Sequence, residues 1–355
     1  MMKVLMAMSG GVDSSVAAKL LCDEGYECIG CTMKLYDNCD AGLPRGRTCC
    51  SLDDVEDARS VAFSLGMRYY VFNFKDDFRE KVIKKFASGY LRGQTPNPCI
   101  DCNRYMKFDK LFERAKLLGC DKIATGHYAR IEFDGRKYRL KKALDKSKDQ
   151  SYVLYMLTQE QLAHALFPLG SLHKTDTRAI ADTADLSSAH KPDSQDICFV
   201  PDGDYAAAIE RLAGIKAPCG NFIDASGKVI GTHRGITHYT VGQHRGLGLS
   251  LPERRYVCSI DAENSTVTLG GSDELYSSTA EVRGFNWISG ETPAEPIRCT
   301  AKIRYRQPEQ PATAIAHSDG SVTLHFDAPQ RAVTPGQAAV LYDGDTVLGG
   351  GEIVR

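Results

Sequence analysis

A glycine- and serine-rich turn at residues 9–15 constrains the fold more than any other stretch of the chain. It reads Ser-Gly-Gly-Val-Asp-Ser-Ser and follows a short apolar run, residues 4–8, of the kind that forms a strand buried on both faces. Residues 16–21 continue as a helix, for which Asp13 or Ser14 could supply the cap. Paired glycines let the backbone approach an anion, and the start of a helix presents unpaired N–H groups. The turn therefore predicts a phosphate or pyrophosphate site between a strand and a helix.

The residues of the turn exclude two common nucleotide-binding loops. The Gly-Lys-Ser/Thr ending of a P-loop is absent, and no Gly-x-Gly-x-x-Gly follows the strand. The turn resembles instead the pyrophosphatase loop of the N-type ATP pyrophosphatases, which cut ATP between the α and β phosphates and leave an adenylylated substrate. That resemblance implies that the backbone and hydroxyls of residues 9–15 grip the pyrophosphate, while Asp13 helps to hold Mg²⁺. A serine-capped turn without a ligand is the alternative.

Length and composition are those of an ordinary globular protein. The chain has 355 residues, 43% hydrophobic and 25% charged, which is enough for two or three domains with separate cores. Its net charge of −1 gives no general attraction to nucleic acid, so a polyanion must be met by local patches. The start is too short for a signal peptide and no apolar run approaches the ~18 residues of a membrane span, which predicts a cytoplasmic protein without a membrane partner. In that compartment the 13 cysteines are expected to be thiols, metal ligands or catalysts.

Strand and helix patterns alternate along the front part of the chain. Strands are expected at 27–33, 69–74 and 122–125, and helices at 53–65, 81–90 and 108–118. This alternation predicts an α/β fold with a doubly wound parallel sheet, whose ligands gather at the carboxyl ends of the strands. The alternation stops near residue 203, which predicts a first domain at 1–203. A small glycine-rich central domain is expected at 204–273, and short runs between Pro, Gly and Asp clusters predict a C-terminal β-barrel at 274–355.

Residues 95–103 hold two cysteines in a position suited to chemistry. Two prolines restrain the loop that delivers Cys102 to a helix expected to begin near Tyr105. A thiol at a helix N-terminus, with Arg104 and Lys107 beside it, should have a lowered pKa and be reactive. The spacing Cys99-x-x-Cys102 is also that of half a zinc or iron–sulfur site, although no second pair at a matching spacing exists.

Two other cysteine stretches are less specific. Residues 191–200 lead from polar residues directly to Cys198 and an apolar pair, and a lone cysteine there is ordinarily a small buried hydrophobe. Cys49 and Cys50 lie in an aperiodic stretch and could be metal ligands or loop thiols. The histidines of the central domain match no compact ligand pattern, so no protein metal site is predicted from them.

Together these stretches resemble the bacterial tRNA-specific 2-thiouridylases of the MnmA type, and the resemblance covers essentially the whole chain. It is carried by residues 9–15, 97–103, 126–128, 148–152, 194–199, 231–236, 303–306 and 335–338. The resemblance implies sulfuration of the wobble uridine at its C2 oxygen in glutamate, glutamine and lysine tRNAs, after adenylylation of that oxygen by ATP. Cys198 would carry the sulfur as a persulfide, and Cys102 would be the partner nucleophile, ending in a Cys102–Cys198 disulfide. The sulfur donor would be a cysteine desulfurase or a sulfur relay protein.

The family pattern also implies the binding residues. Those for the nucleotide are Ala7, Met8, Ser9, Gly10, Gly11, Val12, Asp13, Ser14, Ser15, Met33 and Gly126. Those for tRNA are Asn97, Pro98, Cys99, His127, Asp149, Gln150, Ser151, Tyr305, Arg306 and Gln337. The wobble base must leave the anticodon stack to react, and residues 97–99 would line its pocket. Lysines at 141, 142, 146 and 148 could attract phosphates, and Arg304-Tyr305-Arg306 could stack with unpaired bases.

Several alternatives remain open at the level of sequence. Cys99 departs from the family pattern, because many relatives carry aspartate there, and Cys99, Cys102 and Cys198 could instead hold an iron–sulfur cluster with an open iron. An amidating ligase could share the pyrophosphatase loop, but it would have no need for the two cysteines. A non-catalytic RNA-binding protein with structural zinc would leave the loop at residues 9–15 unexplained.

Overall fold

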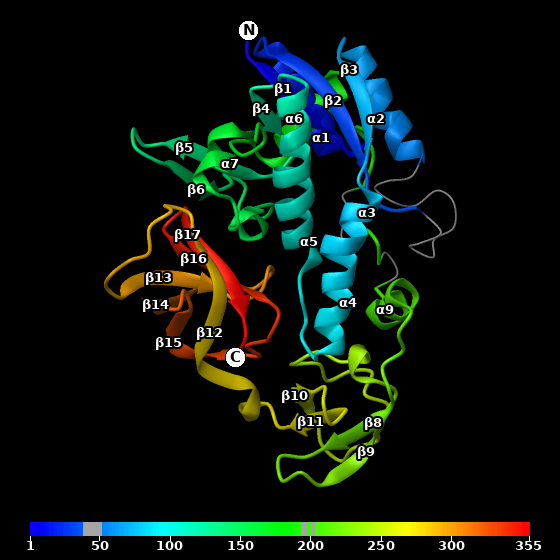
Figure 1. The fold of residues 1–355 in the computed structure, drawn as a ribbon, viewed down its shortest axis with the longest axis vertical. Coiled ribbons are helices and arrows are strands. Elements are labelled where there is room, and N and C mark those ends of the chain that lie inside the picture. The colour runs from blue at the N-terminus through cyan, green and yellow to red at the C-terminus, as the bar shows by residue number, and fades with distance from the viewer. Residues whose placement is uncertain (38–51, 193–196, 201–202) are drawn as a thin grey trace.

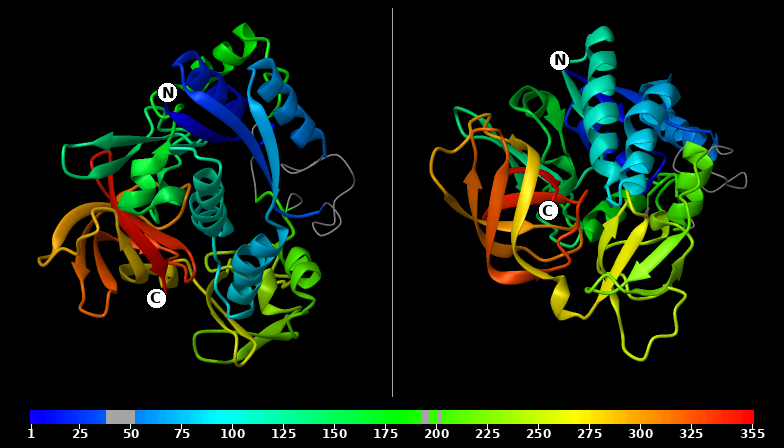
Figure 2. Two further views of the ribbon diagram at one scale, coloured as in Figure 1. Left: turned by 45° about the horizontal axis from the view of Figure 1, so that its top comes forward. Right: turned by 60° about the horizontal axis from the view of Figure 1, so that its bottom comes forward.

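The structure is a computed structural model that describes residues 1–37, 52–192, 197–200 and 203–355. The predictions for Cys49 and Cys50, and the family motif at residues 194–196, lie outside the described residues. Figure 1 shows the parallel sheet of the first domain, the C-terminal barrel and the smaller central domain as three bodies, and the views in Figure 2 show the barrel and the central domain beside each other. Among the described residues, no helix has both the length and the apolar character needed to cross a bilayer.

Five described strands form the parallel sheet of the first domain. They are β1 (Lys3–Ala7), β2 (Glu27–Lys34), β3 (Arg68–Asn73), β4 (Lys122–Ala124) and β7 (Ala165–Leu166), in the order β3-β2-β1-β4-β7. Because the chain proceeds outward from β1 in both directions, the order reverses between β1 and β4. In such a sheet the ligand crevice opens at the carboxyl ends of the strands beside the reversal. This confirms the predicted doubly wound α/β fold and places the crevice.

Helices cover both faces of this sheet. One face buries apolar residues of α1 (Val12–Asp23), α2 (Leu52–Ser64) and α8 (Lys174–Thr183). The other face packs against two long helical runs, which bury Phe78, Phe86, Tyr90 and Phe108 in the core. The first run joins α3 (Lys75–Phe78) to α4 (Lys84–Leu91), and the second joins α5 (Pro98–Asp101) to α6 (Leu111–Leu117). Each run passes through a π-helical stretch, at Arg79–Ile83 and at Cys102–Lys110. The smaller elements α7 (Gln159–His164) and a 3₁₀ turn at Ser151–Leu154 complete the domain.

Two local predictions for the first domain are wrong. The N-cap of α1 is Gly11, and no side chain caps this helix, so neither Asp13 nor Ser14 does. The helix that carries Cys102 begins at Pro98 rather than near Tyr105, because the Asn97 side chain accepts a hydrogen bond from the Cys99 N–H and caps it there. Cys102 therefore lies one turn inside the helix.

The central domain combines a short helix with a small sheet. Helix α9 (Tyr205–Ala213) begins at an N-cap, Asp204, whose side chain accepts from the Ala207 N–H. The sheet has the order β10-β11-β8-β9. Its strands are β8 (Gly220–Ile223), β9 (Val229–His233), β10 (Tyr256–Asp261) and β11 (Thr266–Gly270), with 3₁₀ turns at Ile236–His238 and Asp273–Leu275. A separate apolar cluster around Phe222 forms its core.

The C-terminal part closes into a barrel, as predicted. Its strands are β12 (Tyr276–Trp287), β13 (Ile297–Lys302), β14 (Gln310–Ala316), β15 (Val322–Arg331), β16 (Ala338–Asp343) and β17 (Thr346–Ile353). They pair in the order β12-β15-β14-β13-β16-β17, and β12 pairs again with β17 to close the ring. Alternating residues of these strands fill the interior.

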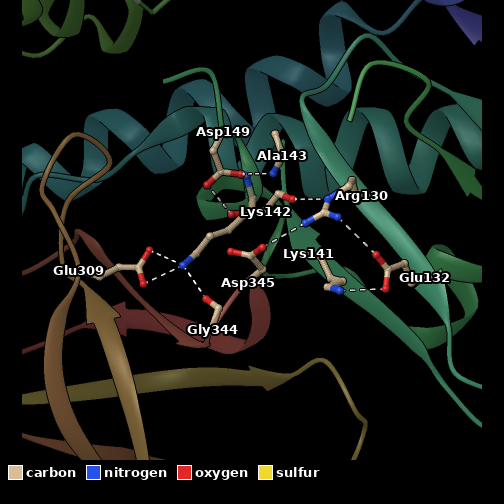
Figure 3. Close-up of polar contacts among 10 residues, drawn as sticks. Arg130, Glu132, Lys141, Lys142, Ala143, Asp149, Glu309, Gly344 and Asp345 are labelled. Carbon is tan, nitrogen blue, oxygen red and sulfur yellow. Dashed lines mark hydrogen bonds and ion pairs between the residues drawn. The ribbon is translucent and has the colours of Figure 1, made fainter. Parts of the chain in front are cut away.

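A hairpin of the first domain attaches the barrel. Strands β5 (Ala129–Phe133) and β6 (Tyr138–Lys142) extend the barrel sheet through a pairing of Lys141 with Thr346. Figure 3 shows the adjoining polar contacts, in which Lys142 Nζ lies 2.7 Å from Glu309 Oε1 and donates to the Gly344 carbonyl. Lys141 is paired with Glu132 in the same hairpin at 2.9 Å. Both lysines thus form ion pairs within the protein, and their attraction for phosphates stays a prediction.

Candidate active site

A cavity of about 360 Å³ opens at the reversal between β1 and β4. Its volume is within the range of small-molecule sites. It is lined by residues from the loop at 9–15, the ends of β2 and β4, the helix that begins at Pro98, and the segment around Cys198. Those lining residues that we predicted for the site are Ala7, Met8, Ser9, Asp13, Ser14, Met33, Pro98, Cys99, Cys102, Gly126, His127, Gln150 and Cys198. Stretches far apart in sequence therefore share one cavity.

The loop at residues 9–15 has the conformation of an anion-binding turn. Gly10 has φ +77°, and a Cβ there would overlap the Asp54 carbonyl group at the start of α2. Ser14 Oγ accepts from the Ser9 N–H at 3.1 Å and donates to the Gly11 carbonyl at 3.1 Å. Ser15 is fully buried. Its hydroxyl donates to the same carbonyl and accepts from Ser188 Oγ at 2.8 Å. The hydroxyl of Ser15 therefore stabilises the turn, and we expect the backbone and the exposed Ser9 to meet a phosphate.

The Asp13 carboxylate is held by two donors on one oxygen. Lys174 Nζ lies 2.6 Å from Asp13 Oδ1, and the Tyr128 hydroxyl donates to the same atom at 2.9 Å. Tyr128 also lies 2.9 Å from Thr177 Oγ1, one turn further along α8. Helix α8, which our sequence predictions did not include, therefore supports the loop at Asp13 and, through Ser188 beyond it, at Ser15.

The ends of β2 and β4 form another part of the cavity wall. Met33 lies at the end of β2, and Gly126 follows β4. A Cβ at Gly126 would lie 2.9 Å from the Asp13 carbonyl carbon and the Ser14 nitrogen, so only glycine allows this approach of the two loops. Thr32 Oγ1 donates to the Met8 carbonyl at 2.7 Å and joins the two strand ends. These positions agree with the predicted nucleotide pocket.

Cys102 lines the cavity from the first residue of the π-helical stretch. Its pKa is raised, because desolvation by the surrounding protein outweighs the favourable charge of Lys107, and Asp101 acts in the same direction as burial. The prediction of a lowered pKa is therefore wrong in this structure. The helix N-terminus lies a turn away, and Asp101 is itself buried, with its carboxylate 2.8 Å from Lys85 Nζ.

Cys198 enters the cavity from a short turn that an aromatic core anchors. The Tyr36 hydroxyl donates to the Cys198 carbonyl at 2.7 Å. Phe199 is buried between Phe78 and Phe86, with ring centroids 5.7 and 5.5 Å away in edge-on contacts. Phe199 therefore anchors the turn in the core. Cys198 itself lines the cavity together with Cys102 and Cys99.

His127 is a buried, neutral histidine whose tautomer follows from its partners. Lys107 Nζ lies 3.3 Å from Nε2, and an ammonium can only donate, so Nε2 accepts. The proton is then on Nδ1, which donates to Thr125 Oγ1 at 2.6 Å. Burial, with a smaller effect of the Lys107 charge, lowers the pKa of His127 well below its ordinary value.

We expect His127 to make the stability of the protein fall in acid. Between its depressed folded pKa and about pH 6.5, the unfolded chain binds a proton that the folded chain does not, so stability decreases as the pH falls, by up to about 1.4 kcal/mol per pH unit. The urea midpoint at pH 7.5 and pH 5.5 measures this. The variant His127→Gln should lose part of the pH dependence, whereas His317→Gln, at an exposed barrel histidine, should retain it. An equal pH dependence in His127→Gln and the wild-type protein would contradict the expectation.

The predicted tRNA contacts divide into two groups in the structure. Tyr305 is exposed, on the barrel loop between β13 and β14, and its ring centroid is 5.8 Å from that of Tyr152. Arg306 beside it is exposed as well. In contrast, Gln337 donates through Nε2 to the Thr95 carbonyl and holds the loop that leads to residues 97–99. Gln337 therefore contributes an internal contact between the barrel and that loop.

The segment at residues 149–151 is turned inward. Asp149 accepts from the Ala143 N–H at 3.0 Å and from the Ser151 hydroxyl at 2.8 Å, and Ser151 is fully buried. Gln150 exchanges two hydrogen bonds with the backbone of Tyr128, through its own N–H and its Oε1. This arrangement favours a supporting role for Asp149 and Ser151, and leaves Gln150 at the cavity wall.

Arg304 joins two domains instead of offering a stacking surface. Its Nη2 donates to the Val241 carbonyl of the central domain, to the Ala332 carbonyl and to Thr334 Oγ1. Burial lowers the pKa of this guanidinium. The predicted stacking role of Arg304 is therefore wrong, and the exposed residues of the motif are Tyr305 and Arg306.

The donor set beside the loop fits Mg²⁺. Asp13 supplies one carboxylate, and Mg²⁺ in nucleotide sites is typically held by one or two carboxylates and the substrate phosphates. Within the described ranges, no three His, Cys, Asp or Glu side chains lie close enough together to hold a metal ion, and these ranges include Cys99, Cys102 and Cys198. His233 is buried in the central domain, where it accepts from the Gly235 N–H and lies 3.1 Å from the Ser265 carbonyl, a structural role.

Comparisons with known proteins cover nearly the whole chain. Three family models match: a tRNA methyl transferase HUP domain over residues 2–202, a tRNA methyl transferase PRC-barrel domain over 212–271 and an aminomethyltransferase β-barrel domain over 277–353. The tRNA-specific 2-thiouridylase MnmA of Acetivibrio thermocellus is 52% identical over 355 residues, 99% of each protein. The tRNA-specific 2-thiouridylase MnmA 2 of Caldanaerobacter subterraneus subsp. tengcongensis is 51% identical over 99% of this chain and 98% of its own. A solved NMN synthetase from Francisella tularensis, 16% identical over 61% of this chain and 78% of its own, has a TM-score of 0.34, which is too low to support an argument.

Proposed function

The chain belongs to the tRNA-specific 2-thiouridylase family, and from this we propose that it replaces the C2 oxygen of the wobble uridine in tRNA with sulfur. One observation supports the proposal best: a single cavity is lined by the pyrophosphate-type loop and by both Cys102 and Cys198. Activation of the uridine by ATP and transfer of sulfur to its C2 require the loop and the two cysteines to reach the same bound uridine. We keep 1–203, 204–273 and 274–355 as the proposed domains.

The loop side of the cavity is suited to the activation step. The uridine O2 attacks the α phosphorus of ATP, a bond forms between them, and the bond from that phosphorus to the bridging oxygen breaks to release pyrophosphate. Ser9 and the N–H groups that begin α1 bind the departing pyrophosphate. Met33 and Gly126 accommodate the adenosine. Mg²⁺ at Asp13 would supply charge neutralisation on the phosphates when bound.

The cysteine side is suited to sulfur transfer. The terminal sulfur of a Cys198 persulfide attacks the activated C2, and the bond from C2 to the adenylated oxygen breaks to release AMP. Cys102 then attacks Cys198 Sγ, so the sulfur stays on C2 as the thiocarbonyl and a Cys102–Cys198 disulfide forms. A dithiol reductant restores both thiols before the next turnover. Release of the persulfide sulfur as free sulfide before attack on C2 is the alternative order.

The tRNA is proposed to approach between the first domain and the barrel. Pro98, Cys99 and His127 line the cavity, and Tyr305 and Arg306 are exposed on a barrel loop. Aromatic and guanidinium groups of this kind stack on unpaired bases. The acceptors proposed are glutamate, glutamine and lysine tRNAs, the sulfur donor is a cysteine desulfurase or a relay protein, and the reaction takes place in the cytoplasm.

Anaerobic thiolation by metal-free protein tests the proposal. The protein is incubated with ATP, unmodified glutamate tRNA and a cysteine desulfurase with cysteine, which supplies sulfur as a persulfide, and digested tRNA is analysed by mass spectrometry. We expect 2-thiouridine together with AMP and pyrophosphate. Methylated uridine, the product suggested by the names of the family models, would contradict thiolation. Product from iron-reconstituted protein alone would keep the tRNA reaction but replace the persulfide route with an iron–sulfur cluster.

A further inference from the structure

Lys174 is the only buried lysine among the described residues. It lies at the first residue of α8, where its backbone N–H donates to Asp145 Oδ2 at 3.0 Å. A buried ammonium is costly unless a carboxylate compensates it, and Asp13 in the pyrophosphate loop lies 2.6 Å from Lys174 Nζ. More than 160 residues of chain separate the two groups, so the tertiary fold brings this pair together.

The two carboxylate oxygens of Asp13 have different surroundings. Lys174 and the Tyr128 hydroxyl both donate to Oδ1, from one side of the loop. No donor among the described residues reaches Oδ2, although Asp13 lines the cavity. One carboxylate oxygen is therefore bound to the protein, and the other has no partner from the described part of the chain.

We propose that Lys174 is a positioning residue that, with Tyr128, holds Asp13 so that one oxygen remains available to the divalent cation of a bound nucleoside triphosphate. This inference rests on the proposed function only in assuming that the cavity binds ATP. Lys174 acts through Asp13 and does not touch the reacting atoms. Its charge also offsets the repulsion between the Asp13 carboxylate and a nearby triphosphate. The arrangement resembles the outer partners of other metal sites, which orient the ligating side chain.

Binding of ATP as a function of Mg²⁺ concentration tests the role without tRNA or sulfur. Isothermal titration calorimetry on the full chain gives the Mg²⁺ concentration at which ATP binding is half-maximal. In Lys174→Met we expect this concentration to rise about tenfold or more, the usual effect of losing an outer partner of a metal ligand. ATP affinity at saturating Mg²⁺ should fall much less. Lys174→Arg should bring this Mg²⁺ concentration most of the way back to the wild-type value, because a guanidinium can also donate to Asp13 Oδ1.

Two further variants make the result decisive. Tyr128→Phe removes the second donor to Oδ1, together with the contact to Thr177, and leaves Lys174 in place. It should raise the Mg²⁺ requirement by a smaller factor, even if Lys174→Met does not fold. Lys19→Met is the matched control, since it removes an ion pair with Asp23, at 2.6 Å, from the same helix as Asp13. It should leave the Mg²⁺ requirement unchanged.

Wild-type Mg²⁺ dependence in both Lys174→Met and Tyr128→Phe, with impaired binding in Asp13→Asn, would overturn the inference. The proposed function would then remain intact. Conversely, wild-type protein that binds ATP with Mg²⁺ but makes no 2-thiouridine would contradict the proposed function and leave the role of Lys174 supported.

Discussion

Thiolation of tRNA is expected to fall by at least about a thousandfold in both Cys102→Ser and Cys198→Ser, as for the loss of other enzymatic nucleophiles. Both residues line the cavity at the pyrophosphate loop, and a serine hydroxyl can neither carry a persulfide nor cleave one. ATP binding should remain close to that of the wild-type protein. The measurements are 2-thiouridine yield and ATP affinity for each variant.

The two variants should differ in the sulfur that they retain. After incubation with a sulfur donor, Cys102→Ser should still carry a persulfide on Cys198, whereas Cys198→Ser should carry none there. Mass spectrometry of the intact and digested protein distinguishes them. Full thiolation by either variant would disprove the relay between two cysteines.

The variant Cys99→Ser distinguishes the relay between Cys102 and Cys198 from an iron–sulfur cluster. Under the relay, Cys99 only lines the cavity, so the variant should retain thiolation within roughly tenfold of wild type, the scale of one lost contact. A cluster held by Cys99, Cys102 and Cys198 would make all three substitutions equally severe. Cys219→Ser, at an exposed thiol of the central domain, is the control for loss of a cysteine elsewhere.

ATP binding is expected to weaken about 100-fold or more in Gly10→Ala. A Cβ at Gly10 would overlap the backbone of Asp54, and the residue has φ +77°, which side chains other than glycine rarely adopt. The loop must therefore move away from α2, and misplacement of binding groups by ~1 Å costs about this much. Calorimetric titration with ATP and Mg²⁺ measures the loss.

Gly25→Ala is the matched control for Gly10→Ala. Gly25 follows α1 with φ +84°, and a Cβ there would contact nothing within 4 Å. The substitution thus imposes the same backbone strain, about 1 kcal/mol or more of stability, without displacing the loop. It should lower the thermal stability and leave ATP affinity unchanged. Equal loss of ATP affinity in both variants would show that backbone strain alone, rather than the contact with Asp54, accounts for the effect.

Local patterns in the sequence were sufficient for the parts of the site that one element supplies. The strand, turn and helix around residues 9–15, and the positions of Met33 and Gly126 at strand ends, follow from periodicity and from the rule that ligands gather at those ends. The hairpin β5–β6 was missed, although Asp134-Gly135 between two strand-like runs is a recognised hairpin signal. That hairpin carries part of the contacts with the barrel.

Predictions failed where the outcome depended on burial or on a distant partner. Lys107 beside Cys102 suggested a lowered pKa, but desolvation in the folded protein has the larger effect and raises it. Arg304 looked like an RNA contact, and it instead joins the barrel to the central domain. In each case the side chain alone does not reveal how much water remains around it.

The sequence by itself determined the α/β fold, the pyrophosphate-type loop and the cysteines proposed for sulfur transfer, because these depend on short patterns of apolar residues, glycines and thiols. Only the tertiary structure decided which groups hold Asp13, since Lys174 and Tyr128 reach it from elements more than 100 residues away. It also decided the direction in which the pKa values of Cys102 and His127 shift. Desolvation and long-range pairing control these properties, and both arise only when separate elements pack together.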